Sequence, residues 1–104
     1  MKKYKLFIHG ENFLLNLDQS QKHGFYTTRF VEAENEGEAE EKAVGMLRND
    51  SNLRDKVSNA VSDPPKMFVE KIVELNSFEG IDLPGTGYTF YVEENVQTEK
   101  SQDN

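Results

Sequence analysis

Alternation of apolar and polar residues predicts a first β-strand over residues 3–9. Every second residue of a strand points to the same face of its sheet. One face of this strand therefore carries three apolar residues, Tyr4, Leu6 and Ile8. The other face carries Lys3, Lys5, Phe7 and His9. Because Phe7 is also large and apolar, we expect apolar groups on both faces of the sheet.

A polar connection is predicted over residues 10–24, where glycine, asparagine, aspartate and serine recur. It contains an apolar cluster of Phe13, Leu14, Leu15 and Leu17. This cluster fits three alternatives: the end of the first strand, a short helical turn, or a flap over the core. Residues 25–34 are rich in aromatic and β-branched residues and predict the second strand.

A helix is predicted to begin after Asn35, because Glu38 follows it at the spacing of a capping box. Apolar residues then recur at helical spacing, at Ala39, Ala43, Met46 and Leu47. Gly45 costs about 1 kcal/mol relative to alanine inside a helix. We expect close packing of Gly45 against the sheet to compensate.

A second helix is predicted after residues 49–52, which can end the first helix and cap the next. Its apolar residues also follow helical spacing, at Leu53, Val57, Ala60 and Val61. It must end before Pro64. Two further strands are predicted over residues 67–75 and 88–94.

The predicted order of elements is ββααββ. Helices between two pairs of strands indicate an α+β class, in which the helices cover one face of a mainly antiparallel four-stranded sheet. We expect a two-layer sandwich of ferredoxin-like or related arrangement. Residues 1–94 are predicted to form one domain, and the polar residues 95–104 a disordered tail.

Composition narrows the functional classes. The 104 residues include no cysteine, which excludes disulfides, thiolate metal sites and cysteine nucleophiles. No apolar run approaches the length of a signal peptide core or a membrane span, so we expect a cytoplasmic protein without membrane contact. The net charge of −7 opposes binding to phosphate backbones.

Residues 6–12 and 24–34 resemble the two short motifs of RNA-recognition-motif domains, which stack bases on aromatic residues. In that family a helix and a strand separate the motifs, whereas only about a dozen residues lie between Ile8 and Phe25. The run after Lys22 also lacks the second glycine of the motif. Weak binding of single-stranded nucleic acid therefore stays a second alternative function.

Large apolar residues on both strand faces indicate an interface, because the helices can cover only one face. We expect the open sheet face to pair with a second copy as a two-fold dimer. The residues predicted for this interface are Phe7, Tyr26, Phe30, Phe68 and Tyr91. The alternative is that residues 13–17 or the loop over residues 76–87 cover this face and leave a monomer.

Candidate ligand-binding residues are polar groups near the first connection and on apolar strand faces: His9, Glu11, Asn12 and Arg29. The glycine-rich residues 83–87 are predicted to form a turn, which could line a cleft with the first three. Arg29 and Lys71 fit a second interpretation, as charges on edge strands that prevent aggregation.

No catalytic residue, cofactor or metal site is predicted. His9, His23 and Glu11 offer suitable donors for a metal, but their spacing matches no recognised signature. The sequence favours a small non-catalytic, self-associating binding or regulatory module. The first alternative is a ligand-binding protein or enzyme of the dimeric ferredoxin-like kind, and a buried polar residue that faces a cavity would favour it.

Overall fold

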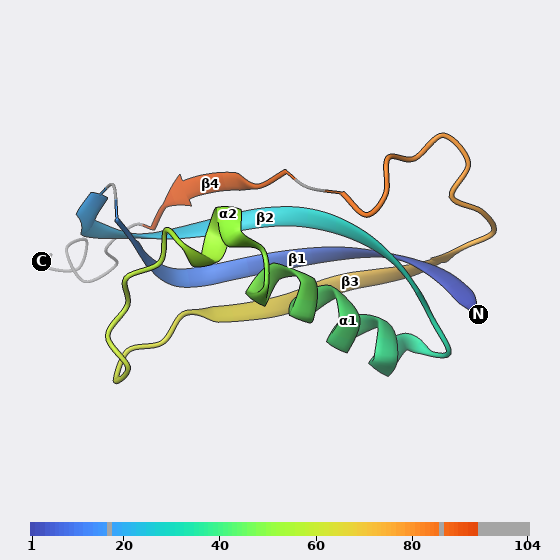
Figure 1. Ribbon diagram of the computed structural model, residues 1–104, viewed down its shortest axis with the longest axis horizontal. Helices are drawn as coiled ribbons and strands as arrows, with labels where there is room; N and C mark the ends of the chain where they lie inside the picture. The colour runs from blue at the N-terminus through green and yellow to red at the C-terminus, as the bar shows by residue number, and fades with distance from the viewer. Residues whose placement is uncertain (17, 86, 94–104) are drawn as a thin grey trace, which may run out of the picture.

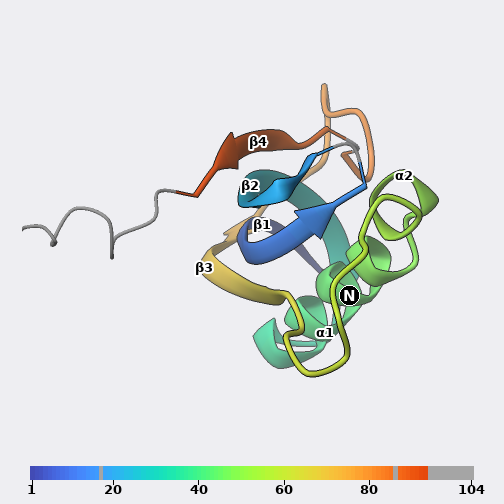
Figure 2. The ribbon, with the colours of Figure 1, turned by 90° about the vertical axis from the view of Figure 1, so that its left-hand side faces the viewer.

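The computed structural model describes residues 1–16, 18–85 and 87–93. The elements are β1 (Lys2–Leu15), β2 (Asp18–Ala33), α1 (Glu36–Arg48), α2 (Ser51–Arg54), β3 (Lys66–Leu75) and β4 (Thr89–Val92). The strands form one open antiparallel sheet in the order β3-β1-β2-β4 (Figure 1). Both helices lie on one side of this sheet (Figure 2).

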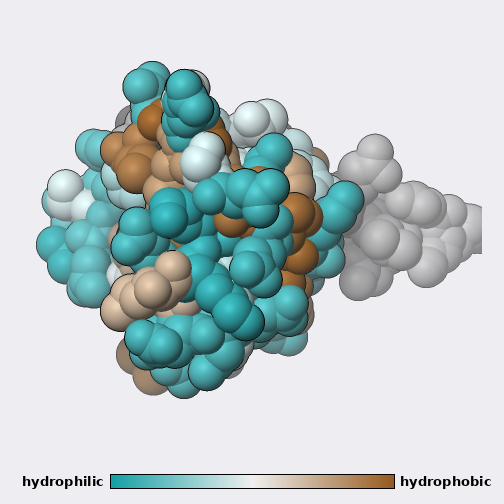
Figure 3. Space-filling model, turned by 90° about the vertical axis from the view of Figure 1, so that its right-hand side faces the viewer, coloured by the Kyte–Doolittle hydropathy of each residue, from teal (hydrophilic) through white to brown (hydrophobic). Residues whose placement is uncertain are grey.

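This arrangement confirms the α+β class and the antiparallel four-stranded sheet. The ferredoxin-like arrangement stays a prediction, and the predicted tail over residues 95–104 lies outside the described residues. No helix in the described ranges is long and apolar enough to cross a membrane. Seen from the end that carries the N-terminus, the surface is largely hydrophilic and is interrupted by separate hydrophobic patches (Figure 3).

β1 and β2 form a hairpin that is much longer than predicted, with backbone pairs from Lys2–Ala33 to Leu15–Asp18. Phe13, Leu14 and Leu15 of the apolar cluster therefore belong to the end of the first strand, and Leu17 lies outside the described residues. Two register shifts flank Phe13, and Asn12 adopts a left-handed φ of 64°, which asparagine tolerates better than most residues. Bulges of this kind interrupt the two-residue alternation, so the sequence pattern does not predict that the strand continues beyond them.

The core lies between the sheet and the helices. Its sheet residues are Tyr4, Leu6, Ile8, Phe13, Phe25, Val31 and Ala33, and its helix residues are Ala39, Ala43, Leu47 and Leu53. The predicted N-cap of α1 is confirmed, because Asn35 Oδ1 accepts a hydrogen bond from the Glu38 amide at 2.9 Å. Glu38 Oε1 accepts from the Glu34 amide at 2.7 Å, one residue before the position that a full capping box uses. The expected close packing of Gly45 is wrong, since a Cβ added there would meet nothing within 4 Å.

The second helix is much shorter than its apolar spacing predicted, because α2 ends at Arg54. The following residues instead pair with the end of β1: the Asn16 amide donates to Lys56 O at 2.8 Å, and the Ser58 amide donates to Leu14 O at 2.8 Å. Val57 forms an isolated bridge with Leu15, and Val61 is 99% exposed. Backbone pairing with the extended hairpin thus replaces further helical turns.

β3 contains a bulge that changes which residues share a face. Ile8 pairs with Val69 and Phe7 pairs with Lys71, so Glu70 is an extra residue on β3. Beyond the bulge, Ile72 packs on the core. Val73 and Leu75, which were predicted to share a face with Val69, lie on the opposite face as a result.

Candidate binding site on the open sheet face

The sheet face away from the helices carries side chains from all four strands. Its central residues are Phe7, His9, Glu11, Tyr26, Phe30, Phe68, Glu70 and Tyr91. The register explains this grouping, because His9 pairs with Tyr26 on one side and with Phe68 on the other. The five aromatic residues predicted for an interface therefore share one face.

His9 is the centre of a polar cluster on this face. Its Nδ1 lies 3.1 Å from Glu70 Oε2, and its Nε2 lies 2.5 Å from Tyr91 Oη. A carboxylate can only accept, so Nδ1 carries a proton and donates to Glu70. Burial, followed by the nearby Tyr26 and Glu93, raises the pKa of Tyr91. In the tautomer that carries its proton on Nδ1, Nε2 accepts a hydrogen bond from the Tyr91 hydroxyl.

Tyr26 covers the imidazole of His9. The two rings are stacked with centroids 4.5 Å apart and planes 12° apart, and Tyr26 also stacks on Tyr91 at 5.5 Å. As a result His9 is buried, although it belongs to the open face. Both ring nitrogens and one ring face are occupied, so His9 acts here as a support that fixes the two tyrosines.

A groove of about 510 Å³ lies beside this cluster, with Phe7, Tyr26, Phe30, Glu70, Gly85 and Gly87 among its lining residues. The segment before β4 forms one wall, because the Phe30 amide donates to Pro84 O at 2.9 Å. Gly85 has a φ of +90°, and a Cβ there would lie 2.7 Å from Thr28 O. Pro84 and Gly85 of the predicted turn therefore contact β2. Glu11 and Asn12 line a different groove.

The open face is only partly covered by its own chain. Phe78 packs edge-on against Phe30, with ring centroids 6.1 Å apart. Phe13, which could have formed a flap, is instead buried in the core. Three aromatic residues of the open face stay accessible: Phe7 is 37% exposed, Tyr26 50% and Phe68 44%.

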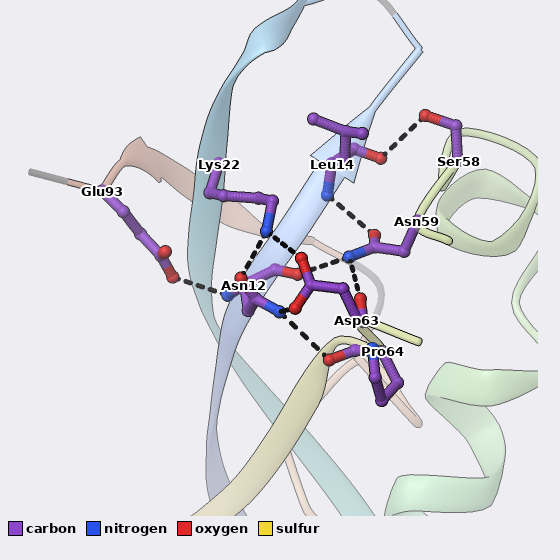
Figure 4. Close-up of polar contacts among 8 residues, drawn as sticks. All are labelled: Asn12, Leu14, Lys22, Ser58, Asn59, Asp63, Pro64 and Glu93. Carbon is purple, nitrogen blue, oxygen red and sulfur yellow. Dashed lines mark hydrogen bonds and ion pairs between the residues drawn. The ribbon is translucent and has the colours of Figure 1, made fainter. Parts of the chain in front are cut away.

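Asn12 belongs to a separate network that ties the hairpin to the segment before β3 (Figure 4). Lys22 Nζ donates to Asn12 Oδ1 at 2.7 Å and to Asp63 at 2.5 Å, and Asn12 Nδ2 donates to Asp63 at 2.8 Å. Asn59 donates to the backbone carbonyl of Asn12 at 2.8 Å. The hydrogen bonds from Lys22 and Asn12 hold the pKa of Asp63 below its ordinary value. These bonds join β1 and β2 to the segment before β3, which indicates a structural clamp.

Glu11 lies between the clamp and the His9 cluster, with its carboxylate 3.7 Å from His9 Nδ1. His23 pairs with Phe13 in the hairpin register. Among residues 1–16, 18–85 and 87–93, no three histidine or acidic side chains are grouped as metal ligands would be.

Arg29 lies on the opposite face of the sheet from His9, and it is 2% exposed. Its guanidinium donates to Thr27 Oγ1 and to Thr28 O, and it lies 4.9 Å from the ring centroid of Tyr88. Asp50 Oδ2 is 3.9 Å from Nη2 and accepts a hydrogen bond from the Tyr88 hydroxyl at 2.7 Å. Because Arg29 is buried on the helix side of the sheet, the interpretation of Arg29 as an exposed edge-strand charge is wrong. Lys71, by contrast, is exposed on the edge strand β3.

The Tyr88 hydroxyl predicts a loss of stability at alkaline pH. Burial and the hydrogen bond to Asp50 raise the pKa of Tyr88 to about 12. The folded state then binds more protons than the unfolded state above pH ~10, so this contribution is complete below pH ~10 and is lost as the pH rises towards 12. Because Tyr88 is only partly buried, we expect the free energy of unfolding to fall by about 1 kcal/mol over this pH range.

The measurement is urea unfolding between pH 9 and 11.5 for the wild type and Tyr88→Phe. The variant should be less stable at pH 9, because it lacks the hydrogen bond to Asp50, and its stability should fall less steeply with pH. Identical slopes in the two proteins would contradict the assignment.

Several partners were not predicted from the sequence. Glu70 reaches His9 only because it is the extra residue of the bulge in β3, and Asp50 meets Tyr88 across 38 positions of sequence. The N-cap position of Asp50 was a partial signal, since residues 49–52 were expected to cap a helix. Comparison of the chain with protein-family models, with curated proteins and with solved structures finds no match.

Proposed function

We propose that this chain is a small non-catalytic binding module that pairs with a second copy of itself through the open sheet face. The observation that carries the proposal is a fixed, accessible group of aromatic side chains with opposite charges at its two ends. Phe7, Tyr26 and Phe68 supply the accessible apolar area. Contiguous apolar surface of this kind marks interfaces more often than it occurs on a free monomer.

The cluster around His9 gives Tyr26 and Tyr91 on this face a fixed geometry. Glu70 and Tyr91 hold the imidazole from its two nitrogens, and Tyr26 stacks on its face. Side chains that are ordered before binding lose little conformational entropy when a partner docks. The same contacts support a non-catalytic role, because a general base needs a nitrogen that can reach a substrate.

Charges along β1 support a second copy as the partner. Lys3 and Lys5 precede Phe7 on the open face, and Glu11 follows His9. Two sheets that face each other across a two-fold axis perpendicular to the strands place the basic end of one β1 over the acidic end of the other. An axis parallel to the strands would bring like charges together, which is unfavourable.

Sedimentation equilibrium tests this proposal. We expect the wild type to dimerise at about 100 µM, well above a micromolar dissociation constant. Lys5→Glu and Glu11→Lys should each weaken the dimer by about tenfold or more, since each change occurs twice in a symmetric interface. The double variant should recover most of the affinity, because it restores opposite charges. Glu40→Lys is the control, because it changes the charge as much as Glu11→Lys does but lies on the exposed face of α1. It should leave the dimer affinity unchanged.

A wild type that sediments as a monomer at that concentration would rule out the dimer. Single variants with unchanged affinity, or a double variant no better than the single ones, would rule out the charge pairing. Weak binding of single-stranded oligonucleotides would appear instead as a salt-dependent titration, and Glu11 and Glu70 on the same face oppose it.

A second candidate function is that of a small-ligand-binding protein of the dimeric ferredoxin-like kind. This candidate assumes the ferredoxin-like arrangement that the sequence predicts. The observation that favours it is the groove of about 510 Å³ beside a buried histidine, a volume within the range of ligand pockets. Tyr26 would stack on a flat aromatic ligand, and Glu70, whose side chain is 52% exposed, would accept a hydrogen bond from it. Ligand-induced protection of Tyr26 in a monomer would favour this candidate over the dimer.

A further inference from the structure

A second apolar groove lies on the helix side of the molecule, between the helices, the segment after α2 and the start of β3. It has a volume of about 570 Å³. Its apolar lining includes the core residues Phe13, Leu47 and Leu53, together with Val57 and Met67. One lining residue, Phe68, also belongs to the open face, but the arginines and the core residues of this groove lie outside the proposed dimer interface.

Cationic side chains surround this groove, although the protein as a whole is acidic. Arg48, Arg54 and Lys66 all line it, whereas the chain contains 19 acidic and only 12 basic residues. Arg48 and Arg54 occupy the last turns of α1 and α2. The last turns of the two helices thus place both arginines beside the same apolar floor.

The two arginines are available to a ligand. Arg48 has no carboxylate partner among the residues that the structure describes. Arg54 Nε lies 3.7 Å from Asp55 Oδ1, and both side chains are more than half exposed, so this pair is weak. Lys66 also borders the acidic groove that contains Glu11 and Asp63, and its charge is therefore partly compensated.

We propose that this groove binds a single-chain anionic amphiphile. The aliphatic chain lies on the apolar floor, and its carboxylate or phosphate head lies between Arg48 and Arg54. The planar guanidinium group suits such heads because it can donate two parallel hydrogen bonds. The volume is in the range of small-molecule sites. The net charge of −7 disfavours contact with an anionic bilayer, so the ligand is a dispersed molecule.

Isothermal titration calorimetry of the full chain with decanoate, below its micelle concentration, tests the proposal. We expect saturable binding of decanoate and at least about tenfold weaker binding of decyltrimethylammonium, which has an equal chain and the opposite charge. Arg48→Gln combined with Arg54→Gln should weaken decanoate binding by about tenfold or more. Both arginines are exposed, so the variant should fold, which circular dichroism verifies.

The matched control is Lys2→Gln combined with Lys71→Gln, which changes the net charge equally at exposed positions outside the groove. It should leave decanoate binding unchanged. In NMR spectra decanoate should shift the resonances of Leu53, Val57 and Met67. Equal binding of the two amphiphiles, no effect of the arginine variant, or binding only to phosphatidylglycerol vesicles would each overturn the proposal.

Discussion

Replacing Gly10 with alanine is expected to destabilise the protein by about 2–3 kcal/mol, the upper range for overpacking. Gly10 pairs with Phe25 across the hairpin, and the ring of Phe25 lies over it. A Cβ at Gly10 would lie 2.2 Å from Phe25 Cε2. The ring cannot move aside, because it is fully buried and packs against Phe13 and Tyr88 at centroid distances of 5.1 Å.

Urea unfolding of four variants, Gly10→Ala, Phe25→Leu, the two combined and Gly45→Ala, separates this effect from the general effect of a glycine-to-alanine change. Gly45→Ala should stabilise the protein by about 0.5–1 kcal/mol, because helix propensity improves and nothing occupies the space. Gly10→Ala combined with Phe25→Leu should cost less than the sum of the single changes, because the smaller side chain makes room for the methyl group. If Gly10→Ala were as stable as the wild type, the packing of the Phe25 ring would not require a glycine at position 10.

Replacing Arg29 with methionine is expected to destabilise the protein by about 3 kcal/mol. The methionine fills part of the volume but removes the donors to Thr28 O and Gly87 O. It also removes the cation beside Asp50, whose pKa is held below its ordinary value first by the hydrogen bond from Tyr88 and also by Arg29. When one charged side chain of a buried cluster is removed, the polar atoms that it contacted stay buried and lose their partner.

A double-mutant cycle with Asp50→Asn measures how far the two charges depend on each other. We expect the double variant to be more stable than the sum of the two single changes predicts, by about 1–2 kcal/mol. Lys71→Met is the control, because Lys71 is exposed on β3 and its loss should change stability by at most about 0.5 kcal/mol. If Arg29→Met matched Lys71→Met, the guanidinium contacts would contribute nothing to stability.

These two predictions concern the support of the open face. Gly10 and Phe25 fix the pairing of β1 with β2, which places His9 beside Tyr26. Arg29 fixes the end of the loop before β4 through Gly87, and β4 carries Tyr91. Loss of either contact should therefore also disturb the proposed interface, so dimerisation must be tested with surface variants that leave the core intact.

Local sequence determined the parts of the fold that depend on neighbouring residues. The α1 start followed from Asn35 and Glu38, because an N-cap hydrogen bond needs only two residues three positions apart. The division of β1 into a core face and an open face at residues 4–9 followed from the two-residue period of a strand. The α+β class followed from the order of these elements.

Only the tertiary structure decided the length of the hairpin, the early end of α2 and the partners of His9 and Arg29. Each depends on contacts between residues that are far apart in the sequence: Leu14 with Ser58, His9 with Glu70 and Tyr91, and Tyr88 with Asp50. A bulge inserts one residue and reverses every later side chain, yet it leaves no periodic signal. Local pattern therefore fixed which strand segments carry the candidate site, and long-range pairing fixed which residues complete it.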